Sequence, residues 1–135
     1  MVVKVRRYKR CDFNQVNKIL NESFDVSKVD KRSRNIEFVA CLSDKVVGYL
    51  VVNKLYDSVR AINYFHINYV CVDSNYRNLG IATKLLEEVF RLAKIKKISY
   101  IELTSNKKRT IAHKLYLDNG FSIRDTNVFR KEIIW

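Results

Sequence analysis

The spacing of hydrophobic residues predicts a strand and then a helix at the start of the chain. Residues 2–5 form a short β-type run. Asp12 then offers a helix N-cap, and the apolar side chains behind it recur at helical spacing, at Phe13, Val16, Ile19, Leu20 and Phe24. Residues 27–35 are highly charged, so we expect either a second short helix or a mobile loop there.

Three strands are predicted in the middle of the chain. Residues 36–42 and residues 46–55 are rich in Val, Ile, Phe and Tyr, and the polar residues between them are typical of a hairpin. Residues 64–72 carry apolar side chains on both faces, which is typical of a central strand. Strict alternation along this strand predicts that one face carries Phe65, Ile67, Tyr69 and Cys71.

The second half of the chain predicts two helices and three further strands. Residues 80–94 and 110–118 have helical spacing, and the strand-type runs are residues 99–104, 121–123 and 128–134.

This order of elements indicates the fold class. A strand, a turn, a helix and a second strand between residues 64 and 104 require a right-handed parallel crossover. The fold class is therefore α/β (α+β), with a mixed central sheet of about six to seven strands flanked by helices. We expect a single domain over residues 1–135.

Composition narrows the class of protein. Hydrophobic residues make up 47% of the chain and charged residues 30%, which argues against disorder. No apolar stretch is long enough to span a membrane, and no signal-peptide core follows the basic first ten residues, so we expect a cytoplasmic protein with no membrane partner. The cysteines at 11, 41 and 71 contain no CxxC pair, so we expect reduced thiols and no metal site.

The charge balance indicates an anionic partner. Lys and Arg number 26 against 14 Asp and Glu, a formal net charge of +12. Such an excess attracts nucleic acid, an acidic membrane surface or a phosphorylated small molecule, and charge alone does not separate them. No helix-turn-helix, zinc-finger or RNA-binding motif is visible, which argues against nucleic acid as the primary partner.

A candidate anion-binding turn lies between the predicted central strand and the helix after it. Its residues are Arg77, Asn78, Leu79, Gly80, Ile81, Ala82 and Thr83. Backbone N–H groups at a helix N-terminus have no helical carbonyl to bind, and the helix dipole is positive there. Gly80 and Ala82 are small enough for a diphosphate to approach the backbone, and Arg77 can neutralise a phosphate.

Two motifs resemble those of the GCN5-related N-acetyltransferase (GNAT) family. The first is [RQ]-x-x-G-x-[GA] after an apolar strand, matched by residues 77–82 behind residues 69–72. The second is A-x-x-x-Y-x-x-x-G-F, matched by residues 112–121. The resemblance implies the family's fold, with a V-shaped splay between the central parallel strands. It also implies a protein that binds acetyl-CoA and transfers acetyl directly to a primary amine of a small molecule.

The resemblance assigns roles to individual residues. Acetyl-CoA would be bound by the seven residues of the turn and by the strand residues Val70, Cys71 and Val72. A backbone N–H near Cys71 or Val72 would polarise the thioester carbonyl, and Tyr116 would protonate the departing thiolate. Asn106 and Arg109 are further candidates for cofactor contact, although Arg109 stands where many members carry Asn.

The proton acceptor for the attacking amine stays open. Members often carry an acidic residue on the central strand, whereas the corresponding positions here are Asn68 and Tyr69. Glu102, His66, Glu37 or a water chain are the alternatives.

Other functions fit the same motifs. The acceptor could be a protein or peptide amine, and the missing strand carboxylate also fits a non-catalytic acyl-CoA-binding module. A nucleic-acid-binding protein is a less favoured hypothesis. The apolar end of the chain, Ile133, Ile134 and Trp135, leaves a homodimer open.

No motif identifies the acceptor. Side chains that could line its pocket are Tyr56, Asp57, Tyr64, Phe65 and Phe129. The positive charge of the chain favours an amine that also carries phosphate or phosphonate.

Overall fold

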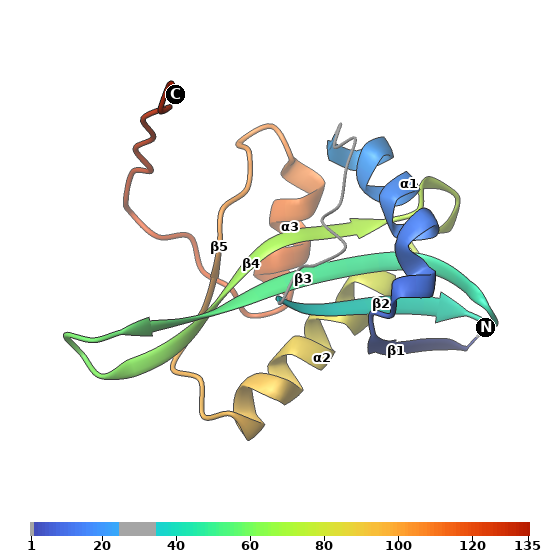
Figure 1. Cartoon of the computed structure of the whole chain (residues 1–135), viewed down its shortest axis with the longest axis horizontal. Helices are drawn as coiled ribbons and strands as arrows, with labels where there is room; N and C mark the ends of the chain where they lie inside the picture. Colours follow the sequence, from blue (N-terminus) through green and yellow to red (C-terminus); the bar gives the residue numbers. More distant parts are fainter. Residues whose placement is uncertain (1, 25–34) are drawn as a thin grey trace. The chain divides into compact units, whose positions relative to one another are not determined.

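The β-type runs of residues 3–103 pair into one five-stranded sheet in the computed structural model, which describes residues 2–24 and 35–135. The strands lie in chain order, as Figure 1 shows. They are β1 (Val3–Arg7), β2 (Ile36–Leu42), β3 (Lys45–Asp57), β4 (Ile62–Val72) and β5 (Ile101–Leu103). The first four pair antiparallel, and β5 pairs parallel to β4, which confirms the predicted parallel crossover.

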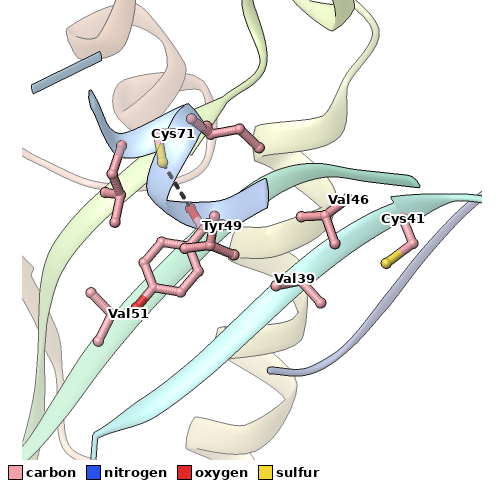
Figure 2. Close-up of a cluster of buried hydrophobic side chains, with 9 residues drawn as sticks. Val39, Cys41, Val46, Tyr49, Val51 and Cys71 are labelled. Carbon is pink, nitrogen blue, oxygen red and sulfur yellow. Dashed lines mark hydrogen bonds between the residues drawn. The ribbon is translucent and has the colours of Figure 1, made fainter. Parts of the chain in front are cut away.

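One face of the sheet is covered by α1 (Phe13–Phe24), which follows a short 3-10 turn (Arg10–Asp12). Its side chains Val16, Ile19 and Leu20 are buried, because they share the apolar stripe that the spacing predicts. They pack with six side chains of β2, β3 and β4, namely Val39, Cys41, Val46, Tyr49, Val51 and Cys71. Figure 2 shows this cluster, in which the Cys71 thiol donates to the carbonyl oxygen of Tyr49 over 3.8 Å.

Helix α2 (Ile81–Ile95) covers the opposite face, where a glycine lets it come close. Gly48 precedes Tyr49 on β3, so its position faces away from α1. A Cβ atom at Gly48 would lie 2.9 Å from Ile81 Cγ2 and 3.2 Å from Leu85 Cδ1. A larger residue here would therefore displace the first turns of α2, whose position against β3 depends on the bare backbone.

A β-bulge interrupts β4 near its middle. Val51 of β3 pairs with Tyr69, whereas the next residue, Val52, pairs with Ile67. One step along β3 thus corresponds to two steps along β4, and Asn68 is the extra residue.

The bulge changes which face the side chains of β4 occupy. Residues paired across strands share a face, so Tyr69 and Cys71 lie on the side of α1, whereas Phe65 and Ile67 lie on the side of α2. The prediction that all four share one face is wrong, because the extra residue shifts the alternation by one position. Phe65 is completely buried, so it does not line an acceptor pocket.

The chain folds as two compact units, residues 1–104 and residues 105–135. The single domain expected over residues 1–135 stays a prediction. The helix or loop expected over residues 27–35 lies outside the described residues, apart from Asn35.

The second unit contains α3 (Thr110–Asp118), over the predicted residues, and this helix ends in a Schellman motif. Gly120 adopts φ +89°, and its N–H donates to Leu117 O over 3.2 Å. The Phe121 N–H donates to Tyr116 O over 3.0 Å, and the two rings meet edge to face at 5.7 Å. The sequence Y-x-x-x-G-F is therefore a helix ending that fixes the ring of Tyr116.

The two closing strands predicted over residues 121–123 and 128–134 are not formed in the described chain. The sheet has five strands where about six to seven were expected. Their composition favours strands, but a strand also needs a neighbour to bind its backbone groups, and composition does not supply one. The apolar side chains of this segment are 68–107% exposed: Ile123, Val128, Phe129, Ile133, Ile134 and Trp135.

Candidate functional site

Strand β4 is paired on both sides at residues 65–67 and on one side over its second half. Its pairing with β5 is confined to residues 65–67, whereas its pairing with β3 continues to Val72. Within the described residues, no strand pairs with residues 68–72 on the β5 side. The parallel strands thus part where the resemblance implies a splay, and this edge of β4 has no strand partner among the described residues.

The backbone of β4 turns specific groups toward this edge. The Asp73 N–H donates to Val47 O of β3 over 2.8 Å. Because successive residues of an antiparallel strand face opposite sides, Cys71 also faces β3, whereas Val70 and Val72 face the edge. Among the strand residues assigned to the cofactor, Val70 and Val72 therefore present N–H and carbonyl groups there, while the Cys71 side chain belongs to the core.

The turn after β4 is folded by Asp73 and by two left-handed residues. The buried Asp73 side chain accepts from Asn75 N–H over 2.9 Å and produces a short 3-10 turn (Ser74–Tyr76). Asn78 and Gly80 then adopt φ +63° and +76°. A Cβ at Gly80 would meet no atom of the described residues within 4 Å, so the backbone conformation and not packing requires glycine.

The helix that follows has an N-terminus without a side-chain cap. Gly80 offers no capping group, and Lys84 N–H donates to Gly80 O over 3.1 Å. The N–H groups of residues 81–83 therefore have no helical acceptor. No acidic residue lies in the first turn, and Arg77 beside it is exposed. An anion fits these donors and the positive end of the helix dipole.

The first unit thus brings together the strand and turn residues predicted to bind the cofactor. They are Val70, Cys71, Val72, Arg77, Asn78, Leu79, Gly80, Ile81, Ala82 and Thr83. The Ile81 side chain points into the core against Gly48, so only its backbone is available to a ligand.

The other predicted site residues, Tyr116, Asn106 and Arg109, lie in the second unit. Burial raises the pKa of the Tyr116 phenol, and the charge of Arg109 lowers it by a smaller amount. Asn106 organises the start of α3, since its Oδ1 accepts from Lys108 N–H over 2.9 Å and its carbonyl lies 2.9 Å from His113 Nε2. The contacts of these residues with acetyl-CoA stay predictions.

The candidate proton acceptors lie in different surroundings. Glu37 is buried and accepts from the Tyr49 hydroxyl over 2.5 Å. Burial, and then the bond to Glu37, raise the pKa of Tyr49 well above its usual range. Glu37 therefore serves the core. His66 and Glu102 are paired neighbours on β4 and β5 and are both accessible to solvent.

Sequence reasoning missed two residues next to His66. Asn68 of the bulge places its Oδ1 2.7 Å from His66 Nδ1. Asn53 pairs with His66 from β3, and no hydrogen-bond partner for its buried Oδ1 is found in the described chain. Nothing in the sequence set Asn68 apart from Asn63 and His66, the other polar residues of this strand, so the bulge had no sequence signal.

The described residues show no feature of a membrane span or a metal centre. None of the helices in that part of the chain is both long and apolar enough to cross a membrane. Residues 2–24 and 35–135 contain no group of three or more His, Cys, Asp or Glu side chains that could hold a metal ion. Cys11 is exposed, Cys41 and Cys71 are buried, and no disulfide joins them.

Two known proteins are similar in sequence to part of this chain. An N-acetylaspartate synthetase of Xenopus tropicalis is 36% identical over 84 residues, which are 62% of this chain and 30% of that protein. An L-amino acid N-acetyltransferase of Escherichia coli is 31% identical over 93 residues, which are 67% of this chain and 55% of that protein. The matches thus span about a third to a half of these two relatives.

The fold also has a solved counterpart. The crystal structure of an aminoglycoside acetyltransferase from an uncultured soil metagenomic sample superposes with a TM-score of 0.84. The match covers 98% of this chain and 97% of that one at 19% identity, which shows a common fold. The acetyltransferase (GNAT) family itself matches residues 5–121. Since that match spans the splayed strand, the turn and the helix ending at Gly120, the chain belongs to the acetyltransferase (GNAT) family.

Proposed function

We propose that this protein is an acetyl-CoA-dependent N-acetyltransferase that moves acetyl directly from the thioester to a primary amine of a small molecule. The observation that carries the proposal is the unpaired edge of β4 leading into an uncapped helix N-terminus. The edge offers backbone groups to the amide-containing arm of coenzyme A, and the helix offers N–H groups to its diphosphate. The names of two relatives, both for N-acetylating enzymes, support it.

The chain's own groups suit this transfer. Val70 and Val72 N–H groups would donate to the thioester carbonyl oxygen as negative charge develops on it. The Tyr116 phenol keeps its proton at neutral pH, because burial raises its pKa, and would supply that proton to the departing sulfur. Arg77 and the net charge of +12 would attract the phosphates of the cofactor.

Calorimetric titration with acetyl-CoA at about 150 mM salt tests the cofactor. We expect micromolar affinity, with coenzyme A as a positive control and NAD as a negative control. Arg77→Ala should weaken binding about tenfold, because it removes a charged hydrogen bond to phosphate. If the unmodified protein fails to bind acetyl-CoA, the proposed function is wrong.

Turnover separates an enzyme from a binding module. A library of small amines, with a peptide arm for the protein-acceptor alternative, would be tested by detecting released thiol. Tyr116→Phe should lower turnover at least about tenfold and leave acetyl-CoA affinity unchanged. Binding without thiol release from any amine would favour the non-catalytic module.

We propose further that the protein is a homodimer in the cytoplasm. The exposed apolar side chains of residues 123–135 present on the order of 1,000 Å², more than the roughly 800 Å² per partner of a standard interface. Light scattering should report a dimer that becomes a monomer when residues 128–135 are deleted, and a monomeric full chain would contradict the dimer.

A further inference from the structure

Three neighbouring strands place one polar side chain each at the same level of the sheet. Asn53 of β3 pairs with His66 of β4, and His66 pairs with Glu102 of β5. Paired residues share a face, so all three side chains lie on the same side. This is the side of α1, because Val51, two residues before Asn53, belongs to the α1 cluster. We call Asn53, His66 and Glu102 the polar row.

The bulge determines which nitrogen of His66 accepts a proton. His66 Nδ1 lies 2.7 Å from Asn68 Oδ1, and a carboxamide oxygen only accepts hydrogen bonds. The neutral ring therefore carries its hydrogen on Nδ1 and its lone pair on Nε2. Beside it, the buried Oδ1 of Asn53 has no partner in the described chain and can accept one further hydrogen.

Aromatic rings continue the polar row on the same face. Tyr64 and Tyr100 stack with ring centroids 4.9 Å apart and planes 14° apart. Tyr100, which directly precedes β5, is 37% exposed, and Glu102 of β5 is exposed. Aromatic faces next to a carboxylate favour an ammonium group. The local chemistry is thus opposite in sign to the net charge of +12.

The described residues that face His66 include few titratable groups. Glu102 faces it from β5, Tyr100 from the position before β5 and Tyr64 from its own strand, while β3 contributes the neutral Asn53. Tyr100 keeps its proton at neutral pH, since desolvation and then the charge of Glu102 raise its pKa.

We propose that the polar row and the two tyrosines form the acceptor subsite of the acetyl transfer, an inference that rests on the proposed function. Glu102 and the rings bind a primary ammonium, Asn53 Oδ1 accepts one of its hydrogens, and His66 Nε2 removes one proton. The acceptor class is a small amine with one ammonium beside an apolar or aromatic arm. This differs from the phosphate-bearing amine that net charge alone favours.

The protons balance in this step. The ammonium gives one proton to His66 Nε2 and becomes a neutral amine. Its nitrogen forms a bond to the thioester carbonyl carbon, and the carbon–sulfur bond breaks. A second nitrogen proton reaches the sulfur, so that an amide, a thiol and a protonated His66 result. His66 then releases its proton to water.

Binding is tested by NMR of the full chain with ¹⁵N-labelled histidine. We expect the Nδ1–H tautomer at His66 in the unliganded protein. Phenethylamine should shift the His66 signals, whereas phenethyl alcohol, which has a similar shape and no charge, should not. An Nε2–H tautomer, or equal shifts with both probes, would overturn the proposal.

Kinetics with phenethylamine test the proton transfer. His66→Gln should lower kcat about 100-fold and abolish the acidic limb of the pH–rate profile, with acetyl-CoA affinity unchanged. Asn68→Ala should reduce the rate through loss of the tautomer, and Asn68→Asp, which keeps an acceptor oxygen, should restore it. Glu102→Gln should raise KM at least about fivefold. The matched control Glu87→Gln, on α2, should not change KM.

The outcomes separate this inference from the proposed function. If the unmodified protein does not bind acetyl-CoA, the proposed function fails. If it binds acetyl-CoA and acetylates amines while His66→Gln retains full turnover and an unchanged pH profile, only the acceptor subsite is wrong.

Discussion

The two halves of β4 belong to one strand, yet they contribute to the site in different ways. Residues 62–67 pair with β3, and residues 65–67 pair with β5 as well, whereas residues 69–72 pair with β3 alone. The first half contributes side chains, above all His66, to a face of the sheet. The second half contributes backbone groups to an edge. Asn68 separates the two halves. Strand pairing thus decides whether a residue of β4 offers its side chain or its backbone groups to the site.

Deletion of Asn68, which separates the two halves of β4, should have the largest effect on stability. Without the extra residue, either the first or the second half of β4 would turn its apolar side chains to the wrong face. The expected loss is about 5 kcal/mol or more, comparable with the stability of a whole domain. Urea unfolding followed by circular dichroism measures it. Asn68→Ala, which keeps the residue count, should stay within about 1 kcal/mol of the unmodified protein. A fully stable deletion variant would show that the bulge does not set the faces.

Substitution of Gly80 tests only the turn after the second half of β4, which we propose binds the cofactor. Val at φ +76° is strained, so the turn should relax and acetyl-CoA affinity should fall about 30- to 100-fold, or about 2–3 kcal/mol. Gly80→Asn is the matched control, because Asn tolerates this conformation, and it should bind within about fivefold of the unmodified protein. Calorimetry compares the three proteins. Equal losses for Val and Asn would indicate that a side chain, not backbone strain, blocks the ligand.

The pH dependence of stability should arise mainly from Asp12, which lies outside β4. A change in the pH–rate profile can then be assigned to the first half of that strand. Asp12 is buried and accepts two hydrogen bonds of 2.8 Å from Arg6, which lower its pKa. A lowered pKa means that this stabilisation is present at neutral pH and is lost as pH falls through the folded-state pKa.

Asp12→Asn should therefore cost about 1–2 kcal/mol at pH 7, since the partly exposed Arg6 is screened by solvent. Its stability should also fall less steeply than that of the unmodified protein in acid. Denaturant titrations between about pH 7 and pH 3 measure both effects. An unchanged acid slope would assign the pH dependence to other carboxylates.

Gly120→Ala should give the smallest effect and sharpen the contrast with Gly80. Alanine at φ +89° strains the Schellman ending of α3 by about 1 kcal/mol. We expect a small loss of stability and faster amide hydrogen exchange at residues 119–121, with acetyl-CoA affinity within about twofold. A loss of affinity as large as that of Gly80→Val would place the helix ending in the cofactor site.

Local features were predictable from the sequence. The helices at Phe13–Phe24 and Thr110–Asp118 and the turn at residues 77–83 match expectation, because their hydrogen bonds and apolar stripes join residues within a few positions. The two family motifs, residues 77–82 and 112–121, are also local, because each lies within one short stretch of the chain. Gly80 and Gly120 stand where the backbone turns left-handed, which residue type alone can indicate.

The sequence by itself therefore determined the order of elements from β1 to α3, the turn at residues 77–83 and the family resemblance. Only the tertiary structure decided that Asn68 is a bulge, that Glu37 serves the core, and that Asn53, His66 and Glu102 form a row. It also showed that residues 121–135, in spite of their composition, form no strands. Strand register joins residues far apart in the chain, and one inserted residue reverses every face beyond it, so no spacing within a single strand contains that information.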